Sequence, residues 1–242
     1  ALPERVLTNA ELERMVDTSD EWITTRTGIR ERRLAAPDEY LSIYATRAAR
    51  QALEAAGVDA GEVDLVLCAT VTPDMITPAS ACFIQESLGA RRAAACDRSA
   101  GCSGFLYALG TARAFIAAGH ARTVLVVGGE ILSRFINWED RGTCVIFADG
   151  AGAVLLRAGE GRAGILSCRL HSDGAYADFI TIAGGGSRYP DTVENVQKRV
   201  NTIRMRGNET FKIAVRSIEE VSREVLAEAE LEPGPVDLFV PY

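Results

Sequence analysis

The first half of the 242-residue chain alternates short apolar runs with segments of helical spacing, and this alternation most constrains the fold. The segments Asp64–Ala69, Ala93–Cys96 and Thr123–Val127 are largely apolar, which is typical of strands buried on both faces. Helix-like segments separate them. The order strand, helix, strand, helix, strand predicts an α/β fold with a mostly parallel sheet and helices on both faces.

Glycines and capping residues predict where the helices begin and end. A glycine follows each of three apolar-periodic segments and suits a C-cap, while Thr8-Asn9 and Asp17–Asp20 suit N-caps. The predicted helices are a short one after Thr8-Asn9 with an acidic first turn, a short one through Trp22, and longer ones over Leu41–Ala56, Pro78–Leu88, Cys102–Ala118 and Asn208–Ala229.

The second half is predicted to be less regular. Further strands are expected at Cys144–Ala148, Ala153–Leu156, Ile165–Leu170 and Val236–Val240. The glycines of Asp149–Gly152, between the first two of these strands, match no phosphate-loop spacing and are interpreted as close backbone packing or a bulge. Ala175–Arg206 is expected to be a long irregular region, and Gly159–Arg162 a break.

Composition excludes several classes of protein. Thirty-three acidic against 26 basic residues give a net charge of −7, which argues against general nucleic-acid binding. No apolar run approaches the roughly 20 residues of a membrane span, and the N-terminus does not resemble a signal peptide. The six cysteines show no zinc spacing, and Cys68, Cys82, Cys96, Cys144 and Cys168 are expected to be free thiols in apolar surroundings. A soluble, cytoplasmic protein without a metal is therefore expected.

Cys102 is the candidate nucleophile. It lies between a predicted strand and helix, within Ala100-Gly101-Cys102-Ser103-Gly104, where small residues allow a tight turn. A helix N-terminus lowers a thiol pKa and offers N–H groups to an oxyanion. The alternative is a structural cysteine at a packed turn. The two histidines, His120 and His171, are interpreted as structural, so no Cys–His pair is evident.

Trp22 lies among arginines that could bind a nucleotide. Arg26, Arg30, Arg32 and Arg33 surround it in sequence, and an aromatic face beside arginines suits an adenine and its phosphates. From the residues alone, a solvated turn with one core tryptophan is favoured over a nucleotide site. Four further basic residues add positive charge in predicted loops or helix starts, where simple solvation is the alternative: Arg141, Arg204, Arg206 and Lys212.

Four segments together resemble one family. They are residues 20–33 (DEWITTRTGIRERR), 101–109 (GCSGFLYAL), 138–156 (WEDRGTCVIFADGAGAVLL) and 207–215 (GNETFKIAV). In order and over the whole length, they resemble β-ketoacyl-acyl-carrier-protein synthase III, the initiating condensing enzyme of fatty-acid synthesis. The resemblance implies a thiolase-like five-layer α/β/α/β/α sandwich of two similar halves, here residues 1–159 and 163–242, and a homodimer.

The resemblance also implies an activity. A cysteine takes an acyl group from acyl-CoA, malonyl-acyl carrier protein then loses CO2, and the carbanion attacks the acyl-cysteine. Acyl-CoA and malonyl-acyl carrier protein are substrates, and no cofactor is implied. Cys102 matches the nucleophile and Thr77 the acyl pocket. Trp22, Arg26 and Arg141 match positions at the CoA nucleotide, Gly207 and Phe211 match the substrate tunnel, and Lys212 matches the carrier-protein docking face.

The end of the sequence departs from the family pattern. Tyr242 stands where the family has a histidine, and the family asparagine would fall beyond it. The sequence is therefore expected to be a fragment truncated at both ends, unstable alone and inactive in condensation. Three other functions stay open: an initiator of polyketide or other secondary metabolism, a non-catalytic partner subunit, and a generic thiol hydrolase. The sequence does not fix the preferred primer, but threonine at position 77 suggests space for longer or branched acyl groups.

Overall fold

The computed structural model describes residues 1–161 and 163–241, which form two compact units. Unit 1 comprises Ala1–Val6, Arg33–Ile131 and the described part of Ala148–Cys168. Unit 2 comprises Leu7–Arg32, Leu132–Phe147 and the described part of Arg169–Tyr242. The division into residues 1–159 and 163–242 stays a prediction, and Arg162 at that boundary lies outside the described residues.

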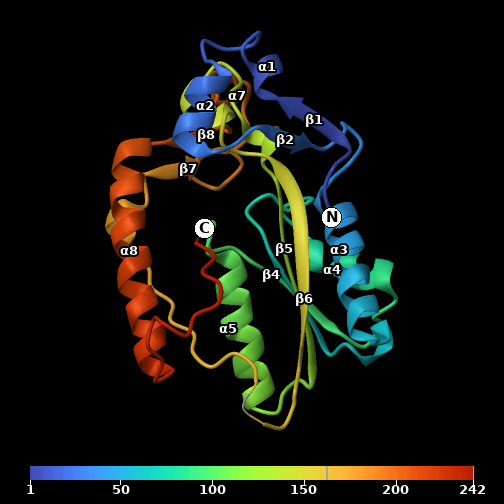
Figure 1. The fold of residues 1–242 in the computed structure, drawn as a ribbon. Coiled ribbons are helices and arrows are strands. Elements are labelled where there is room, and N and C mark those ends of the chain that lie inside the picture. Colours follow the sequence, from blue (N-terminus) through green and yellow to red (C-terminus); the bar gives the residue numbers. More distant parts are fainter. Residues whose placement is uncertain (162, 242) are drawn as a thin grey trace. The chain divides into compact units, whose positions relative to one another are not determined.

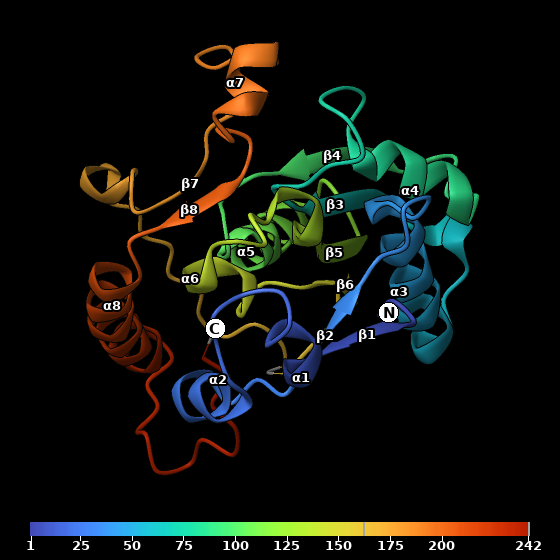
Figure 2. The same ribbon diagram turned by 90° about the horizontal axis from the view of Figure 1, so that it is seen from above.

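A four-stranded sheet forms the centre of unit 1, in the order β4-β3-β5-β6 (Figure 2). β3 (Leu65–Ala69) pairs in parallel with both β4 (Ala94–Arg98) and β5 (Thr123–Ile131). β6 (Asp149–Arg157) pairs antiparallel with β5. The predicted mostly parallel sheet is therefore confirmed.

Helices cover both faces of this sheet (Figures 1 and 2). α3 (Leu41–Ala56) and α4 (Ser80–Leu88) pack on one face, and α5 (Gly104–Ala117) packs on the other. Alternate residues of β5 belong to the two cores: Leu125 and Val127 to the core with α3, Val124 and Val126 to the core with α5. This alternation follows from the two-residue period of a strand.

Local capping explains why the helix boundaries could be predicted. Gly57 and Gly89 take the left-handed conformation, with φ of 62° and 74°, and end α3 and α4. Thr8 forms a capping box with Glu11 at the start of α1 (Asn9–Leu12). Ser19 caps α2 (Asp20–Thr27), which continues beyond the predicted end at Trp22.

Two strands of unit 1 were predicted too short because glycines were taken as their boundaries: Thr123–Val127 stops too early and Ala153–Leu156 starts too late. β5 continues through Gly128 and Gly129 to Ile131, and Asp149–Gly152 lies inside β6 rather than between two strands. A Cβ on Gly129 would lie 2.8 Å from the Cβ of Ala151 and 2.9 Å from Cδ1 of Leu41. A Cβ on Gly150 would lie 2.9 Å from Cδ2 of Leu2, whereas a Cβ on Gly152 would meet nothing within 4 Å, so close packing accounts for Gly129 and Gly150 but not for Gly152.

β4 was predicted to be buried, and this is wrong. The strand lies at the edge of the sheet, where it pairs only with β3 among the described strands. Its residues alternate between exposed and half-buried, and Cys96 is exposed. Ala95 packs against the core with α3 and α4, whereas no described β4 residue belongs to the core with α5, so Ala94, Cys96 and Arg98 on the other face are exposed.

The predicted strand Cys144–Ala148 is also wrong. Arg141–Cys144 forms the short helix α6 in unit 2, and no strand includes residues 145–148. The Asp140 carboxylate accepts hydrogen bonds from the Gly142 N–H at 2.9 Å and from the Thr143 hydroxyl at 2.8 Å. This N-terminal cap turns the backbone into a helix despite the β-branched residues that follow.

Unit 2 contains a hairpin inside the segment predicted to be irregular. β7 (Ile180–Ile182) pairs antiparallel with β8 (Ile203–Met205), and α7 (Val193–Gln197) lies in the connection between them (Figure 2). α8 (Gly207–Glu228) follows, as predicted to within one residue at each end. The remaining elements are the paired strands β1 (Arg5–Thr8) and β2 (Glu31–Leu34) and the 3-10 helices Ala60–Glu62, Leu132–Phe135 and Gly174–Tyr176.

Two other predicted strands are absent from the described part of the chain. Ile165–Leu170 and Val236–Val240 form neither helix nor strand, and no described strand pairs with them. Leu238 and Val240 are 78% and 76% exposed. An apolar run forms a stable strand only when it finds a neighbouring strand, which a local pattern cannot supply.

Candidate functional site

Cys102 lies in the turn between the end of β4 at Arg98 and the start of α5 at Gly104. It is exposed, and it precedes the helix by two residues, so the prediction that it opens the helix is wrong by that margin. Gly101 has a φ of 55°, a conformation that residues with a Cβ rarely adopt. The predicted tight turn therefore depends on the glycine immediately before the thiol.

Close packing holds the start of α5 on the sheet. A Cβ on Gly104 would meet the Cβ of Ala69 at 3.4 Å, and a Cβ on Gly128 would meet the ring of Phe105 at 3.0 Å. Ala69 ends β3, and Gly128 lies near the end of β5. The small residues therefore bring the turn over residues 99–103, which carries the candidate nucleophile Cys102 and is called the nucleophile turn below, to the carboxyl edge of the sheet. This is where α/β proteins commonly place their sites.

The electrostatic environment of Cys102 differs from the expectation of a lowered thiol pKa. Desolvation by the surrounding protein raises the pKa of the Cys102 thiol, and the charge of Glu130 raises it further, although the residue has exposed surface. A hydrogen bond from its own backbone N–H acts in the opposite direction. The thiol is thus less acidic in the absence of substrate than its place near a helix N-terminus alone suggests.

Glu130, which the sequence did not single out, lies at the same edge of the sheet. Its carboxylate accepts hydrogen bonds from the Val71 N–H at 2.9 Å, the Thr72 N–H at 3.0 Å, and the hydroxyls of Thr70 and Thr72. Burial raises the pKa of Glu130, and these hydrogen bonds partly offset the effect. The only sequence signal for Glu130 was an acidic residue shortly after the apolar segment Thr123–Val127.

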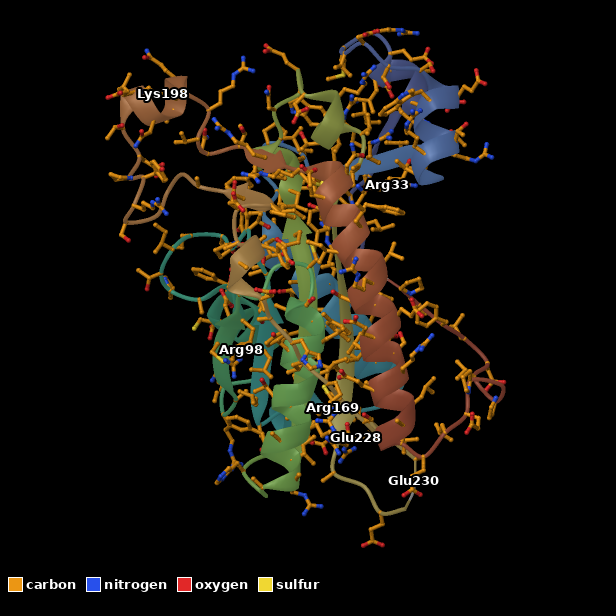
Figure 3. All side chains as sticks on the ribbon, turned by 90° about the vertical axis from the view of Figure 1, so that its left-hand side faces the viewer. Arg33, Arg98, Arg169, Lys198, Glu228 and Glu230 are labelled. Atoms are coloured by element: carbon orange, nitrogen blue, oxygen red, sulfur yellow. The ribbon has the colours of Figure 1, made fainter. Side chains whose placement is uncertain are left out.

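The histidines have partners away from the nucleophile turn. The ring of His120 packs edge-on against Phe115 at 6.2 Å between centroids, after the far end of α5. In unit 2, His171 contacts Glu224 of α8 at 2.6 Å. Beside it, Arg169 pairs with Glu228 at 2.7 Å, and both side chains are visible in Figure 3. No strand ends at His171, contrary to the prediction.

Unit 2 brings together three residues that were predicted to bind a nucleotide. The guanidiniums of Arg26 and Arg141 lie 4.6 Å and 4.9 Å from the centroid of the Trp22 ring. Arg141 also donates to the backbone carbonyl of Asp17 at 3.0 Å, which orients it. Trp22 is half-buried and both arginines are exposed. A planar aromatic group with two cations beside it can bind an adenine and its phosphates.

Other arginines in the predicted cluster have structural partners. Arg32 is buried, donates to the Val145 carbonyl through Nε at 3.1 Å and Nη2 at 2.8 Å, and contacts Asn9 at 2.6 Å. Arg33 donates to the carbonyl of Pro3 at 3.3 Å. Arg32 is therefore a structural residue inside the fold and not part of a solvated turn, and Arg33 is half-buried.

The remaining predicted site residues are exposed. Gly207 begins α8, and Phe211 and Lys212 follow within its first two turns, with Phe211 69% exposed. Thr77 lies in the loop between β3 and α4, beside the exposed Ile76. Thr77 and Cys102 belong to unit 1, whereas the other predicted site residues belong to unit 2. Tyr242 lies outside the described residues.

The other cysteines divide by burial, and all six thiols are free. Cys68 and Cys144 are buried, Cys82 and Cys168 are half-buried, and Cys96 is exposed. Among the described residues, no group of three or more His, Cys, Asp or Glu side chains is arranged to hold a metal ion. In the same part of the chain, no helix has both the length and the apolar character of a membrane span.

Comparisons with known proteins agree with this architecture. A model of the 3-oxoacyl-[acyl-carrier-protein (ACP)] synthase III family matches residues 96–174, which include the nucleophile turn, β5 and β6. The β-ketoacyl-[acyl-carrier-protein] synthase III of Roseiflexus sp. (strain RS-1) is 52% identical over the whole chain, which spans 74% of that relative. The synthase III of Symbiobacterium thermophilum is 53% identical, and the chain spans 73% of it.

Solved structures of related enzymes are also similar over nearly the whole chain. The 3-oxoacyl-[acyl-carrier-protein] synthase III of Aquifex aeolicus VF5 has a TM-score of 0.88 and 47% identity, and the match covers 98% of this chain and 72% of that one. The priming β-ketosynthase of the R1128 polyketide pathway has a TM-score of 0.86 at 34% identity, over 98% and 70% of the two chains. Of these two structures, the one named as a synthase III is the more similar in sequence, so the comparison does not favour the polyketide alternative.

Fold, site and relatives together define a condensing enzyme of the thiolase-like fold, which is an acyltransferase. Within that class, the chain belongs to the β-ketoacyl-[acyl-carrier-protein] synthase III family of fatty-acid biosynthesis.

Proposed function

We propose that this chain forms the acyl-enzyme through Cys102, the intermediate whose acyl group a synthase III enzyme condenses with malonyl-acyl carrier protein. The observation that carries the assignment is the thiol in a glycine-dependent turn at the carboxyl edge of the sheet, two residues before α5. The names of the relatives support the carrier-protein substrate. In this proposal both thioesters are substrates, and no separate cofactor is needed.

The reaction has two stages. The Cys102 thiolate attacks the carbonyl carbon of the acyl-CoA thioester, and the tetrahedral intermediate collapses to acyl-cysteine with release of CoA thiolate, which takes up a proton. Malonyl thioester then loses CO2, and the resulting carbanion attacks the acyl-cysteine carbonyl. The carbon–sulfur bond breaks, giving a 3-ketoacyl thioester and regenerating the Cys102 thiolate.

We assign the nucleotide of the acyl-CoA to Trp22, Arg26 and Arg141. Adenine would stack on the indole, and the exposed guanidiniums would pair with phosphate oxygens. The existing contacts of both arginines with Trp22 support this assignment. Gly207 and Phe211 would line the pantetheine tunnel, and the exposed Lys212 would attract the acidic carrier protein.

We further propose a cytoplasmic homodimer, with thiolase-like halves over residues 1–159 and 163–242. The edge of β4 that β3 does not occupy is available for pairing with a second copy, which supports a dimer. In such a dimer, Thr77 would border the partner's acyl pocket. Its side chain is small, which favours primers longer or more branched than acetyl.

The acyl-enzyme step has a direct test. After incubation with radiolabelled acetyl-CoA, the peptide containing Cys102 should carry the label, and Cys102→Ser should abolish it. Cys96→Ser is the matched control because Cys96 is the other exposed cysteine. Label that persists in Cys102→Ser, or that is lost in Cys96→Ser, would show that the nucleophile has been assigned to the wrong residue.

A further inference from the structure

Arg32 of β2 is a buried charged side chain to which the proposed reaction gives no role. Only 2% of its surface is exposed. Its Nε and Nη2 donate to the Val145 carbonyl at 3.1 Å and 2.8 Å, and its Nη1 donates to the side-chain oxygen of Asn9 at 2.6 Å. Both acceptors are neutral groups. Because burial of a charge costs free energy, three directed hydrogen bonds indicate that this arginine fixes the geometry around it.

On one side, Arg32 holds the end of α6. Val145 is the C-cap of this four-residue helix, and Arg141 is its first residue. A helix of this length is about one turn, so the Val145 carbonyl is fixed close to the backbone of Arg141. The hydrogen bonds of Arg32 therefore hold the position from which the Arg141 guanidinium reaches the Trp22 ring, 4.9 Å from its centroid.

On the other side, Arg32 holds the start of α2 through Asn9. The Asn9 side chain is buried, and its Nδ2 donates to the Asp20 carboxylate at 2.6 Å and to the Ile29 carbonyl at 2.9 Å. Arginine only donates and a carboxylate only accepts, so an amide between them suits both. Asp20 is the first residue of α2, two residues before Trp22. Arg32, Asn9 and Asp20, called the Arg32 network below, therefore connect α6 to α2.

The two arginines beside Trp22 depend on this connection differently. Arg26 is four residues after Trp22 in α2, so their contact follows from helix geometry. Arg141 comes from α6, so its contact with the ring depends on the separation of the two helices. At the surface, Arg141 also contacts Asp17, at 3.0 Å to the carbonyl and 3.9 Å to the carboxylate. Both side chains are exposed there, and exposed ion pairs constrain a structure weakly.

We propose that Arg32 is a positioning residue that acts through Asn9 and Asp20 to set the separation of α2 and α6, and so places Arg141 against Trp22 for the nucleotide of acyl-CoA. The inference rests on the proposed function in so far as it names the nucleotide. Arg32 itself touches no substrate and acts only through the helices that carry Trp22 and Arg141.

The geometry is tested without a ligand, by NMR of the arginine Nε–Hε groups. A guanidinium over an indole ring is shifted upfield by the ring current. Arg32→Lys retains the charge but lacks the planar fork, so the Arg141 signal should move downfield, toward that of a solvated arginine. The Arg26 signal should keep its position because its contact with Trp22 lies within α2. An Arg141 signal at the wild-type position in folded Arg32→Lys would overturn the proposal.

The consequence for substrate is measured as a ratio: kcat/KM for enzyme acylation by acetyl-CoA, divided by that for acetylpantetheine, which lacks the nucleotide. Arg32→Lys should lower this ratio roughly tenfold or more, as expected for loss of one hydrogen bond to a charged group, through the KM for acetyl-CoA. Acylation by acetylpantetheine should stay at the wild-type rate, which a general loss of folding would not allow. Arg14→Lys, at an exposed arginine of unit 2, is the matched control.

Asp20, at the exposed end of the Arg32 network, provides a second pair of variants in case Arg32→Lys does not fold. Asp20→Ala removes the acceptor of Asn9 and should change the Arg141 signal and the ratio in the same direction. Asp20→Asn retains an acceptor oxygen and should restore both. A wild-type Arg141 signal in Asp20→Ala would also overturn the proposal.

Trp22→Ala separates this proposal from the proposed function. If Trp22→Ala lowers the ratio and Arg32→Lys does not, the nucleotide site is correct and the positioning role of Arg32 is wrong. If Trp22→Ala leaves the ratio at the wild-type value, the nucleotide binds elsewhere and that part of the proposed function is wrong. The Arg141 signal then decides by itself whether Arg32 sets the separation of α2 and α6.

Discussion

Cys102 combines an accessible position with a thiol that is harder to ionise than an ordinary cysteine. Thiolate is the nucleophile, so the raised pKa reduces its population at neutral pH when no substrate is bound. Protection from alkylation and oxidation is one consequence.

Trp22 is the residue at which substrate recognition can be tested alone. Trp22→Ala should raise the KM for acyl-CoA, with a smaller effect on the KM for malonyl-acyl carrier protein. Stacking of a base on an aromatic ring contributes roughly 1–3 kcal/mol, which corresponds to an increase of about 5- to 150-fold. Trp22→Phe is the matched control because it retains an aromatic face. Equal KM values for acyl-CoA in wild type and Trp22→Ala would place the nucleotide elsewhere.

Contacts between individual residues could be predicted from the sequence when the two residues are close together in it. Trp22 and Arg26 are four residues apart in one helix, so their contact follows from helix geometry. Arg141 is distant in sequence, and only the family resemblance associated it with Trp22. Glu130 was missed because its significance depends on Thr70–Thr72, a segment 58 to 60 residues earlier.

At the scale of elements, Asp64 joins the starts of two parallel strands. Asp64 immediately precedes β3. Its carboxylate accepts hydrogen bonds from the backbone N–H groups of Arg122 at 2.8 Å and Thr123 at 3.0 Å, where β5 starts. The Arg122 N–H, followed by the Thr123 N–H, holds the pKa of Asp64 below its ordinary value. The folded state therefore favours the ionised carboxylate.

A depressed folded-state pKa makes the contribution of Asp64 depend on pH. The stabilisation is present above the unfolded-state pKa of about 3.9 and is lost as the pH falls through the lower folded-state value. Asp64→Asn should lower the melting temperature by about 2–4 °C at pH 7, and the difference should shrink as the pH falls toward 3. Asp38→Asn, at an exposed aspartate outside helices and strands, is the control. A difference that grows on acidification would show that the ionised Asp64 carboxylate does not stabilise the fold.

The boundaries of an element could be predicted when the residues that determine them are neighbours in sequence, and could not when those residues are far apart. α3 and α4 end at glycines, and α1 begins at a capping box, so their boundaries were readable from neighbouring residues. β5 runs through glycines whose close neighbours are distant in sequence: Gly128 packs against Phe105 of α5, and Gly129 against Ala151 of β6 and Leu41 of α3. The hairpin of β7 and β8 joins segments about 20 residues apart, and no local pattern indicated the pairing.

At the scale of the whole molecule, primer choice depends on the proposed dimer. Thr77→Phe would fill the space that we assign to the partner's acyl pocket, so activity with isobutyryl-CoA should fall relative to acetyl-CoA. Each buried methylene contributes about 0.8 kcal/mol, or roughly fourfold in kcat/KM. Competition between the two acyl-CoAs measures the ratio. Thr77→Ser is the control, and the same ratio in Thr77→Phe and wild type would remove position 77 from the pocket.

The nine-residue antiparallel ladder between β5 and β6 has a consequence for how unit 1 opens. β5 has a strand on each side and a helical layer on each face, so the amides of Val124–Val127 cannot meet solvent unless the whole sheet separates. In hydrogen–deuterium exchange, these amides should be the slowest in unit 1, at the rate of global unfolding. The amides of β4 should exchange earlier through local fraying. The strand that leads to the nucleophile turn would then be the first part of the sheet to loosen, while the strand that carries Glu130 would be the last.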